Sequence, residues 1–197
     1  PPDLDGLRIS QLTDIHLSPF LSLKQLARAV SLANEWRPHL ALVTGDLVTG
    51  RVDPLDDCLR ELAKLRPSDG IFGCLGNHEG YIGAGSYCAR EGYRLGIRFL
   101  RAETRYMRFG RAGLNLAGVD YQSMGGPYLS GLERLLRENR FNMLLSHNPD
   151  VFPTAVEQGY RLVVSGHTHG GQLALELAGV SFSLPRLFTP YVRGLYR

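Results

Sequence analysis

The segment Gly166-His167-Thr168-His169-Gly170-Gly171 places two histidines two residues apart between glycines. The preceding residues 160–165 (YRLVVS) predict a buried strand, so the histidine pair stands where that strand ends. Residues two apart on an extended backbone point the same way, and glycine permits unusual backbone angles. Both imidazoles can therefore face one small volume and bind a metal ion. A tight turn that carries two surface histidines is the alternative interpretation.

The composition indicates one globular domain, residues 1–197. The chain is 44% apolar and 21% charged, which suits a sizeable core, and its net charge of +3 is too small to indicate nucleic-acid binding. Three cysteines form neither a metal motif nor a disulfide framework. No apolar run is long enough to span a bilayer, and no signal peptide is visible. Because the chain begins Pro1-Pro2 without methionine, we expect a catalytic domain excised from a longer protein.

Strands and helices alternate in the first half of the sequence. Apolar runs predict strands at 7–13, 40–44 and 71–75, and helical spacing predicts helices at 22–36, 55–65 and 86–95. Ser22 and Gln25 form a capping box for the first helix. Asp53 is the expected N-cap of the second helix, with Pro54 in its first turn.

The second half mixes strands and helices. Strands are predicted within 98–119 and at 141–145 and 172–177, with Gly110 and Gly113 as turn residues. A capping box of Ser130 and Glu133 predicts a helix through Glu138. Asn148-Pro149 predicts another helix start, although Pro153 fits poorly inside a helix. The order of elements indicates a layered α/β domain.

Polar side chains of metal-binding types follow five of the predicted strands. They are Asp14, His16, Asp46, Asn77, His78, His147, His167 and His169. Ligands in open α/β sheets gather at the carboxyl ends of strands, so these side chains can meet. Carboxylate, imidazole and amide ligands suit manganese, iron or zinc, and two ions about 3.5–4 Å apart are the usual clamp for displacement at phosphorus. A shared carboxylate is needed to bridge such ions, and Asp46 is the candidate.

These motifs resemble those of the calcineurin-like metallophosphoesterases, in the usual order. The matching residues are Asp14-x-His16, Gly45-Asp46, Gly76-Asn77-His78-Glu79, His147 and Gly166-His167-x-His169. The opening LDGLRISQLTDIHLS, the segment LLSHNPD and the closing GHTHGGQ are most similar to the bacterial YkuE-like phosphoesterases. The resemblance implies a four-layer α-β-β-α sandwich of two packed mixed sheets flanked by helices.

The resemblance also implies a role for each motif residue. The first metal would be held by Asp14, His16 and His169, the second by Asn77, His147 and His167, with Asp46 as the bridge. Two divalent ions are expected, manganese first, with iron, zinc or nickel as alternatives. A hydroxide shared by the ions would be the nucleophile. His78 would bind no metal and would stabilise charge on the phosphate or protonate the leaving oxygen.

Two positions depart from the family pattern. Thr49 stands where an aspartate often follows the bridging one, so His78 is expected to be less strongly polarised. Glu79 stands where aspartate is common. The chain also ends at Arg197, where relatives usually continue into further strands.

The resulting functional hypothesis is a dinuclear metal-dependent phosphodiesterase or pyrophosphatase, with a lipid-linked or nucleotide-containing phosphoester as substrate. The resemblance implies a bacterial protein associated with the membrane through a segment outside this chain. A non-catalytic scaffold on the same fold and a nuclease are the alternatives, and no nucleic-acid partner is expected. The sequence leaves the oligomeric state open.

Several further residues have two interpretations each. The arginines between 90 and 111 form either a solvated face or a site for anionic lipid head groups. Asp120 either reaches the substrate or closes a turn. Tyr81 and Tyr121 either line a pocket or serve packing.

Overall fold

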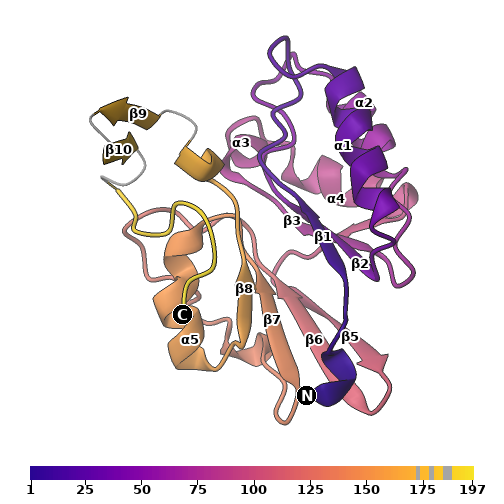
Figure 1. Cartoon of the computed structure of the whole chain (residues 1–197), viewed down its shortest axis with the longest axis vertical. Helices are drawn as coiled ribbons and strands as arrows, with labels where there is room; N and C mark the ends of the chain where they lie inside the picture. Colours follow the sequence, from indigo (N-terminus) through magenta and orange to yellow (C-terminus); the bar gives the residue numbers. More distant parts are fainter. Residues whose placement is uncertain (172–173, 178–179, 184–187) are drawn as a thin grey trace.

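The computed structural model describes residues 1–171, 174–177, 180–183 and 188–197. Its strands form two four-stranded sheets and a separate two-stranded ribbon (Figure 1). The chain completes the first sheet before it begins the second, so each sheet is built from a continuous part of the sequence.

The first sheet is parallel throughout. Its strands, in spatial order, are β1 (Ile9–Leu12), β2 (Leu40–Thr44), β3 (Ile71–Cys74) and β4 (Ile97–Phe99). Parallel neighbours need crossover connections, and these contain α1 (Leu23–Glu35), α2 (Leu55–Leu62), the short α3 (Asn77–Tyr81) and α4 (Gly85–Arg94). Helices α1, α2 and α4 lie on one face of the sheet (Figure 1).

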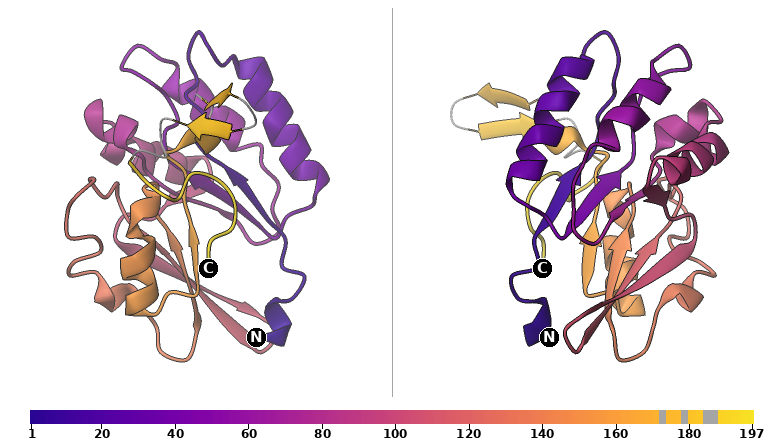
Figure 2. Two further views of the ribbon diagram at one scale, coloured as in Figure 1. Left: turned by 60° about the vertical axis from the view of Figure 1, so that its left-hand side comes forward. Right: turned by 90° about the vertical axis from the view of Figure 1, so that its right-hand side faces the viewer.

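The second sheet is mixed. It contains β5 (Glu103–Phe109), β6 (Ala112–Gly118), β7 (Phe141–Leu145) and β8 (Leu162–Val164), of which β5 is antiparallel to β6 and the others run parallel. Helix α5 (Phe152–Gln158) covers its outer face (Figure 2). Two mixed sheets were expected, and the second sheet is mixed. The first sheet is parallel instead, because even its last strand, β4, pairs with β3 in the parallel sense.

Three apolar clusters define the layers. One fills the space between the first sheet and its helices, and another joins the second sheet to α5. The third lies between the sheets, where Leu42 and Phe72 of the first meet Leu116 and Met143 of the second. Burial of these side chains from both sheets is the main apolar contribution that holds the layers together. The predicted four-layer arrangement is confirmed.

Two predicted helix starts are confirmed. The Ser22 side chain accepts from the Gln25 backbone N–H, and the Gln25 side chain accepts from the Ser22 backbone N–H, a capping box. The Asn148 side chain accepts from the Asp150 N–H at the start of a 3-10 turn, Pro149–Val151, which leads into α5. Pro153 then falls in the first turn of α5, where its missing N–H costs no helical hydrogen bond.

The predicted N-cap at Asp53 is wrong. Its carboxylate accepts from the N–H groups of Thr49 and Gly50, at 2.9 and 2.7 Å, and so closes the loop after β2. Pro54 takes the cap position, and α2 begins at Leu55.

The predicted helix from Ser130 to Glu138 is also wrong. Only a single 3-10 turn forms there, Glu133–Leu135, without a side-chain cap. The Asn142 side chain accepts from the Arg137 N–H and donates to the Arg137 carbonyl, at 3.0 Å each. These bonds engage the backbone groups that a longer helix would use for itself.

Strand β8 is half-buried rather than buried, because it pairs only with β7 in the described part of the chain. Gly110 lies in the β5–β6 turn, as predicted, but Gly113 lies inside β6. The strand expected at 172–177 is confirmed as β9 (Ala174–Leu177), which pairs with β10 (Val180–Ser183), while residues 172–173 lie outside the described residues. Among the described helices, none combines the length and the apolarity that a membrane crossing needs.

Candidate metal centre

The carboxyl ends of β1, β2 and β3 in one sheet and of β7 and β8 in the other meet at one edge of the sandwich. The segments that follow these ends, which are loops and the start of α3, carry all of the sequence-predicted site residues. These are Asp14, His16, Asp46, Asn77, His78, His147, His167 and His169. Donor atoms from both sheets approach within 4.8 Å of one another there. The sheets must therefore pack together before the site exists.

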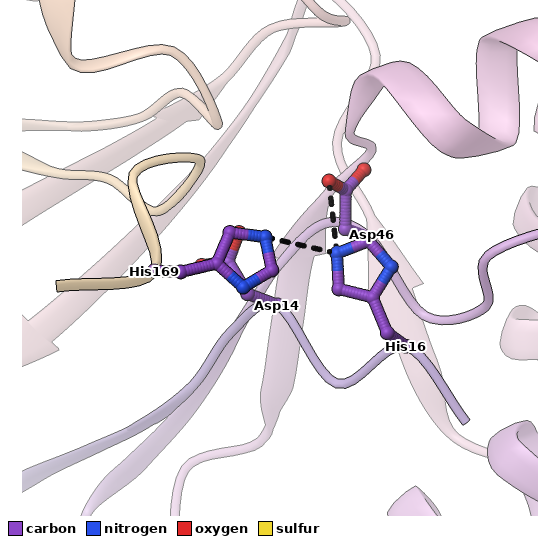
Figure 3. Close-up of side chains that lie close together, drawn as sticks. All are labelled: Asp14, His16, Asp46 and His169. Carbon is purple, nitrogen blue, oxygen red and sulfur yellow. Dashed lines mark hydrogen bonds and ion pairs between the residues drawn. The ribbon is translucent and has the colours of Figure 1, made fainter. Parts of the chain in front are cut away.

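Four side chains form the first group able to hold a metal ion: Asp14, His16, Asp46 and His169. Figure 3 shows them pointing toward one another. The Nε2 atoms of His16 and His169 stand 3.2 Å apart, and the His16 Nε2 lies 3.5 Å from Asp46 Oδ2. Two nitrogens bound at about 2.1 Å to one ion would stand roughly this far apart. The geometry therefore fits a shared cation.

The second group contains Asp46, His147 and His167. The His147 Nε2 lies 3.1 Å from Asp46 Oδ2 and 3.3 Å from the His167 Nδ1. The other ring nitrogen of His147 donates to the Thr44 carbonyl at 2.6 Å, which fixes the ring orientation. Asp46 belongs to both groups, as a bridging ligand would have to.

Asn77 has a buried amide oxygen without a partner. Its Oδ1 makes no hydrogen bond to any described group, although the residue is only 7% exposed. A buried polar atom left unpaired costs free energy, so such an atom usually has a ligand. This orphaned oxygen supports the fit of the site to a cation.

His78 is oriented by the backbone of Thr49. Its Nδ1 lies 2.8 Å from the Thr49 carbonyl oxygen, which only accepts, so Nδ1 carries the proton and Nε2 remains available. The His78 N–H also donates to Asp46 Oδ1 at 3.0 Å, and its ring meets the His16 ring edge-to-face at 4.6 Å. The Thr49 carbonyl therefore supplies an acceptor for the histidine at the position where the family often has an aspartate. The Thr49 hydroxyl in turn lies 3.2 Å from His16 Nδ1.

Glu79 has a role that the sequence did not reveal. Its carboxylate is fully buried, and it accepts from the N–H groups of Asp46 (3.0 Å), Leu47 (2.8 Å) and Gly76 (2.8 Å). Charge-assisted hydrogen bonds of this kind are stronger than neutral ones. Glu79 therefore ties the loop after β2 to the loop after β3 and holds the backbone of Asp46 in place.

Most of the predicted ligands have a left-handed backbone. Nine described residues other than glycine have a positive φ, and five of them are Asp14, His16, Asp46, His167 and His169, with φ between 47° and 76°. This conformation is costly for such residues and persists only where the surroundings enforce it. Its concentration here indicates that backbone strain is used to aim the side chains inward.

Glycines precede the ligands because there is no space for a side chain. A Cβ on Gly76 would lie 2.1 Å from Asp46 Oδ1, and a Cβ on Gly166 would lie 2.6 Å from Asp14 Oδ2. At Gly45, with φ +89°, a Cβ would come within 2.5 Å of the Gly76 nitrogen. The three glycines let the loops of both sheets approach each other closely.

The electrostatics favour an ionised bridge. Burial alone would raise the pKa of the Asp46 carboxyl, but hydrogen bonds from His147 and His16 and the charge of His147 lower it well below its usual range. Burial lowers the pKa of His147, yet the hydrogen bond and charge of Asp46 outweigh burial and raise it. Burial and the neighbouring His147 lower the pKa of His167. Metal binding requires the neutral imidazoles, so it competes with the proton that His147 shares with Asp46.

The remaining candidates from the sequence are placed around this centre. Asp120 forms a two-pronged ion pair with Arg101, at 2.9–3.1 Å, and belongs to neither metal group. Arg90 and Arg94 both bond to Glu91, at 3.1 and 3.2 Å. These ion pairs favour the interpretation of the arginine stretch as a solvated face.

Tyr81 and Tyr121 contact the site histidines. The Tyr81 ring centroid lies 5.7 Å from that of His78, and the Tyr121 centroid lies 5.4 Å from that of His167. Burial, followed by the charges of Tyr81 and Asp46, raises the pKa of Tyr121. Both rings therefore lie beside the candidate metal groups.

Two layered sheets with paired Asp and His groups at their common edge define the metallophosphoesterase class. The family model for calcineurin-like phosphoesterases matches residues 7–171. The chain belongs to the calcineurin-like phosphoesterase family, a family of metal-dependent phosphoesterases, and it carries a candidate dinuclear centre typical of that family.

Named relatives agree with this assignment. The chain is 30% identical over 211 residues to the uncharacterized metallophosphoesterase YkuE of Bacillus subtilis, covering all of this chain and 70% of that protein. It is 32% identical over 210 residues to a zebrafish (Danio rerio) transmembrane protein with metallophosphoesterase domain, and the match covers 100% of this chain and 47% of that protein. It is 29% identical over 197 residues to phosphodiesterase YaeI of Escherichia coli, and the match covers 95% of this chain and 69% of that protein. The predicted resemblance to YkuE-like proteins is confirmed.

A solved structure supports the fold. The protein TT1561 of Thermus thermophilus superposes with a TM-score of 0.63 at 15% identity and covers 91% of this chain and 89% of its own. At that identity the likeness concerns the fold alone. The chain spans about half the length of the zebrafish relative, 47%, and 70% of YkuE.

Proposed function

We propose that the chain is the catalytic domain of a phosphoester hydrolase that uses two divalent cations and acts on phosphodiester or pyrophosphate bonds. The observation that carries the proposal is the pair of ligand groups that share Asp46. Such a pair could hold two cations, and two cations in one site would stabilise the attacking and leaving oxygens of a displacement at phosphorus. Together the groups draw on both sheets, which supports treating residues 1–197 as one domain.

In this proposal the ligands divide as the family resemblance implies. Asp14, His16 and His169 hold one cation, Asn77, His147 and His167 hold the other, and Asp46 binds both. When bound, two such cations supply Lewis acidity and make hydroxide available from water at neutral pH. The protein contributes orientation, because Thr44 and Thr49 fix two imidazoles and Glu79 fixes the loop that carries Asp46.

His78 is proposed to donate a proton to the leaving group. Its Nδ1–H is held by the Thr49 carbonyl, so Nε2 is the nitrogen that can act on the substrate. The protonated ring can stabilise charge on the phosphoryl oxygens or donate its Nε2 proton to the departing oxygen. The bond from its backbone N–H to Asp46 keeps this ring beside the metal groups.

The proposed substrate is a phosphoester, and the names of two relatives narrow its class. YaeI is named a phosphodiesterase, which supports a diester. The zebrafish relative is named a transmembrane protein, which supports membrane association of the parent protein and, with it, a lipid-linked substrate. A nucleotide-containing substrate rests on the family resemblance alone. Manganese is the proposed metal, carried over from the family resemblance; the carboxylate ligands suit it, whereas the imidazoles equally suit iron, zinc or nickel. A scaffold function is disfavoured, because every predicted ligand position is filled.

The test compares hydrolysis of bis(p-nitrophenyl) phosphate with that of p-nitrophenyl phosphate, in the presence of manganese. Bound metal is counted by mass spectrometry. We expect turnover of the diester, two bound ions, and loss of both turnover and full metal loading in Asp46→Asn. The matched control is Asp69→Asn, an exposed aspartate outside both metal groups. Turnover of the monoester alone would change the substrate class, and failure to bind any metal would support the scaffold alternative.

A further inference from the structure

A wide groove lies at the end of the second sheet that is opposite the candidate metal centre. The residues that line it surround the amino ends of β6, β7 and β8, whereas the metal groups follow the carboxyl ends of β7 and β8. The length of β7 alone separates the two ends by roughly 15 Å. Figure 1 shows the N-terminus at the same end of this sheet, and Pro1 lines the groove. This amino-end groove, with a volume of about 930 Å³, is therefore separate from the metal groups.

The charged side chains of the amino-end groove are mostly arginines without an acidic partner. They are Arg111, Arg137, Arg140 and Arg161, beside Glu133 and Glu138. The ion pairs among the described residues include none of these six. The groove side chains carry a formal net charge of +2, compared with +3 for the whole chain. Like charges held together repel one another, so an anion bound among these arginines would lower the electrostatic energy.

A second groove, beside α4, also contains four arginines but differs in how their charges are paired. Each of them lies within 3.9 Å of a carboxylate oxygen. They are Arg90, Arg94, Arg98 and Arg101, and their partners are Glu91, Glu103 and Asp120. The charge of this α4 groove is neutralised by the protein itself, whereas that of the amino-end groove is not.

Two of the unpaired arginines are held in place by packing. The guanidinium carbons of Arg137 and Arg140 lie 5.6 and 5.7 Å from the ring centroid of Tyr106, in cation–π contacts. The Asn142 side chain bonds to both backbone groups of Arg137 and so fixes the loop that carries the two arginines. The Arg140 guanidinium uses one of its five donors on the Asn139 carbonyl. Both guanidinium groups therefore keep donors for a ligand at defined positions.

We infer that the amino-end groove binds the phosphate head groups of anionic lipids and is the face of the domain that lies against a membrane. The inference rests on the membrane association of the parent protein proposed above, and not on hydrolysis. Arginine forms bidentate hydrogen bonds to phosphate, and basic pockets beside a bilayer bind lipid head groups. All four arginines are exposed, so they can meet groups that project from a surface. Leu136 and Phe141 are half-buried in the groove and offer apolar contact to the carbon atoms of the lipid.

A nucleic acid is the alternative partner for a basic groove. Tight binding of a nucleic acid requires contacts to many successive phosphates. A net charge of +2 in one groove supplies few such contacts, and the rest of the chain adds little, which favours the lipid surface.

Co-sedimentation with phospholipid vesicles tests the inference. The protein is kept free of metal by a chelator, so that lipid phosphate has no metal ion to bind. We expect binding to vesicles of phosphatidylglycerol and phosphatidylcholine in equal parts, and none to phosphatidylcholine alone. An arginine beside an anionic surface contributes roughly fivefold to the partition coefficient. The double variant Arg137→Gln with Arg140→Gln should therefore lower it by about twentyfold to thirtyfold.

The matched control is the double variant Arg90→Gln with Arg94→Gln. It removes the same two charges from the α4 groove, where Glu91 already pairs with both arginines, so it should lower the partition coefficient by less than about threefold. With manganese, both double variants should cleave bis(p-nitrophenyl) phosphate as fast as wild type, because neither groove contains a metal-group residue. This second readout shows that the variants are folded.

The outcomes separate this inference from the proposed hydrolase. Equal loss of vesicle binding in the two double variants would show that only net charge matters, and would overturn the assignment of the groove. Failure of wild type to bind the anionic vesicles would also overturn it. Binding of a single-stranded RNA that depends on Arg137 and Arg140, without vesicle binding, would assign the groove to nucleic acid instead. A lack of diester turnover in wild type counts against the hydrolase and leaves the vesicle result unchanged.

Discussion

Replacing Glu79 by glutamine should destabilise the protein although the shape of the side chain is nearly unchanged. The buried carboxylate accepts three backbone N–H groups, two at Oε2 and one at Oε1. Glutamine retains one carbonyl oxygen, which can still accept from Asp46 and Gly76. Its amide NH₂ would then face the Leu47 N–H, and two donors cannot bond to each other.

The magnitude follows from the bonds lost. A hydrogen bond to a charged group contributes about 1.5–3 kcal/mol, and a neutral one contributes about 1 kcal/mol. Loss of the Leu47 bond and weakening of the other two bonds should together cost about 3 kcal/mol. For a chain of 197 residues this corresponds to a decrease in Tm of roughly 9 °C.

The assay is thermal and urea unfolding of the metal-free protein, so that ligand binding does not contribute. Glu103→Gln is the matched control, because that side chain is 55% exposed and its contact with Arg98 is 3.9 Å long. It should change Tm by about 1 °C or less. A Tm for Glu79→Gln equal to that of this control would refute the argument that Glu79 holds the two loops together.

Three further predictions concern the same structure. Gly45→Ala should lower the free energy of unfolding, measured in urea, by more than about 2 kcal/mol, because its Cβ would overlap the Gly76 backbone. The control Gly96→Ala has a similar φ of 86° but lies in open space, so it should cost only about 1 kcal/mol. Equal costs would contradict the close-approach argument. Removal of metal by a chelator should lower Tm. Manganese at 100 times its Kd should restore about 2.7 kcal/mol of unfolding free energy for each site, as calorimetry would show. A Tm insensitive to manganese would contradict the metal-site assignment. The three buried cysteines should not react with a thiol reagent until the protein unfolds, because burial raises the pKa of each thiol, that of Cys88 to about 12. The unfolded thiols ionise near pH 8.5–9 and the folded ones do not, so the free energy of unfolding should fall as pH rises above about 9, and a flat profile would contradict this.

The candidate ligands could be picked out from the sequence because each follows an apolar run that forms a strand. Runs such as LALVT at 40–44 identify the strands, and a side chain of a metal-binding type follows each run within two residues. Parallel strands deliver their carboxyl ends to one edge, so the order of the elements predicts that the candidates of each sheet lie at one edge of that sheet. The pattern is local in the chain, and local patterns are what a sequence displays.

Other features depend on contacts between distant residues. Glu79 reaches the loop after β2 across more than thirty positions, and nothing in the sequence distinguishes it from a surface carboxylate beside a motif. The capping box at Ser130 failed because Asn142, from the next strand, bonds to the backbone that the helix needed. Asp53 likewise bonds to the loop before it rather than to the helix after it.

By itself, the sequence determined the class of fold, the family and a set of candidate metal-binding side chains. These follow from hydrophobic periodicity and from the chemistry of a few residue types. Only the tertiary structure decided that Asp46 lies in both candidate metal groups, that the Thr49 carbonyl orients His78, and that the rings of Tyr81 and Tyr121 lie beside site histidines. The reason is physical: distances between side chains on separate loops are set by the packing of the two sheets and by the left-handed backbone at the ligands.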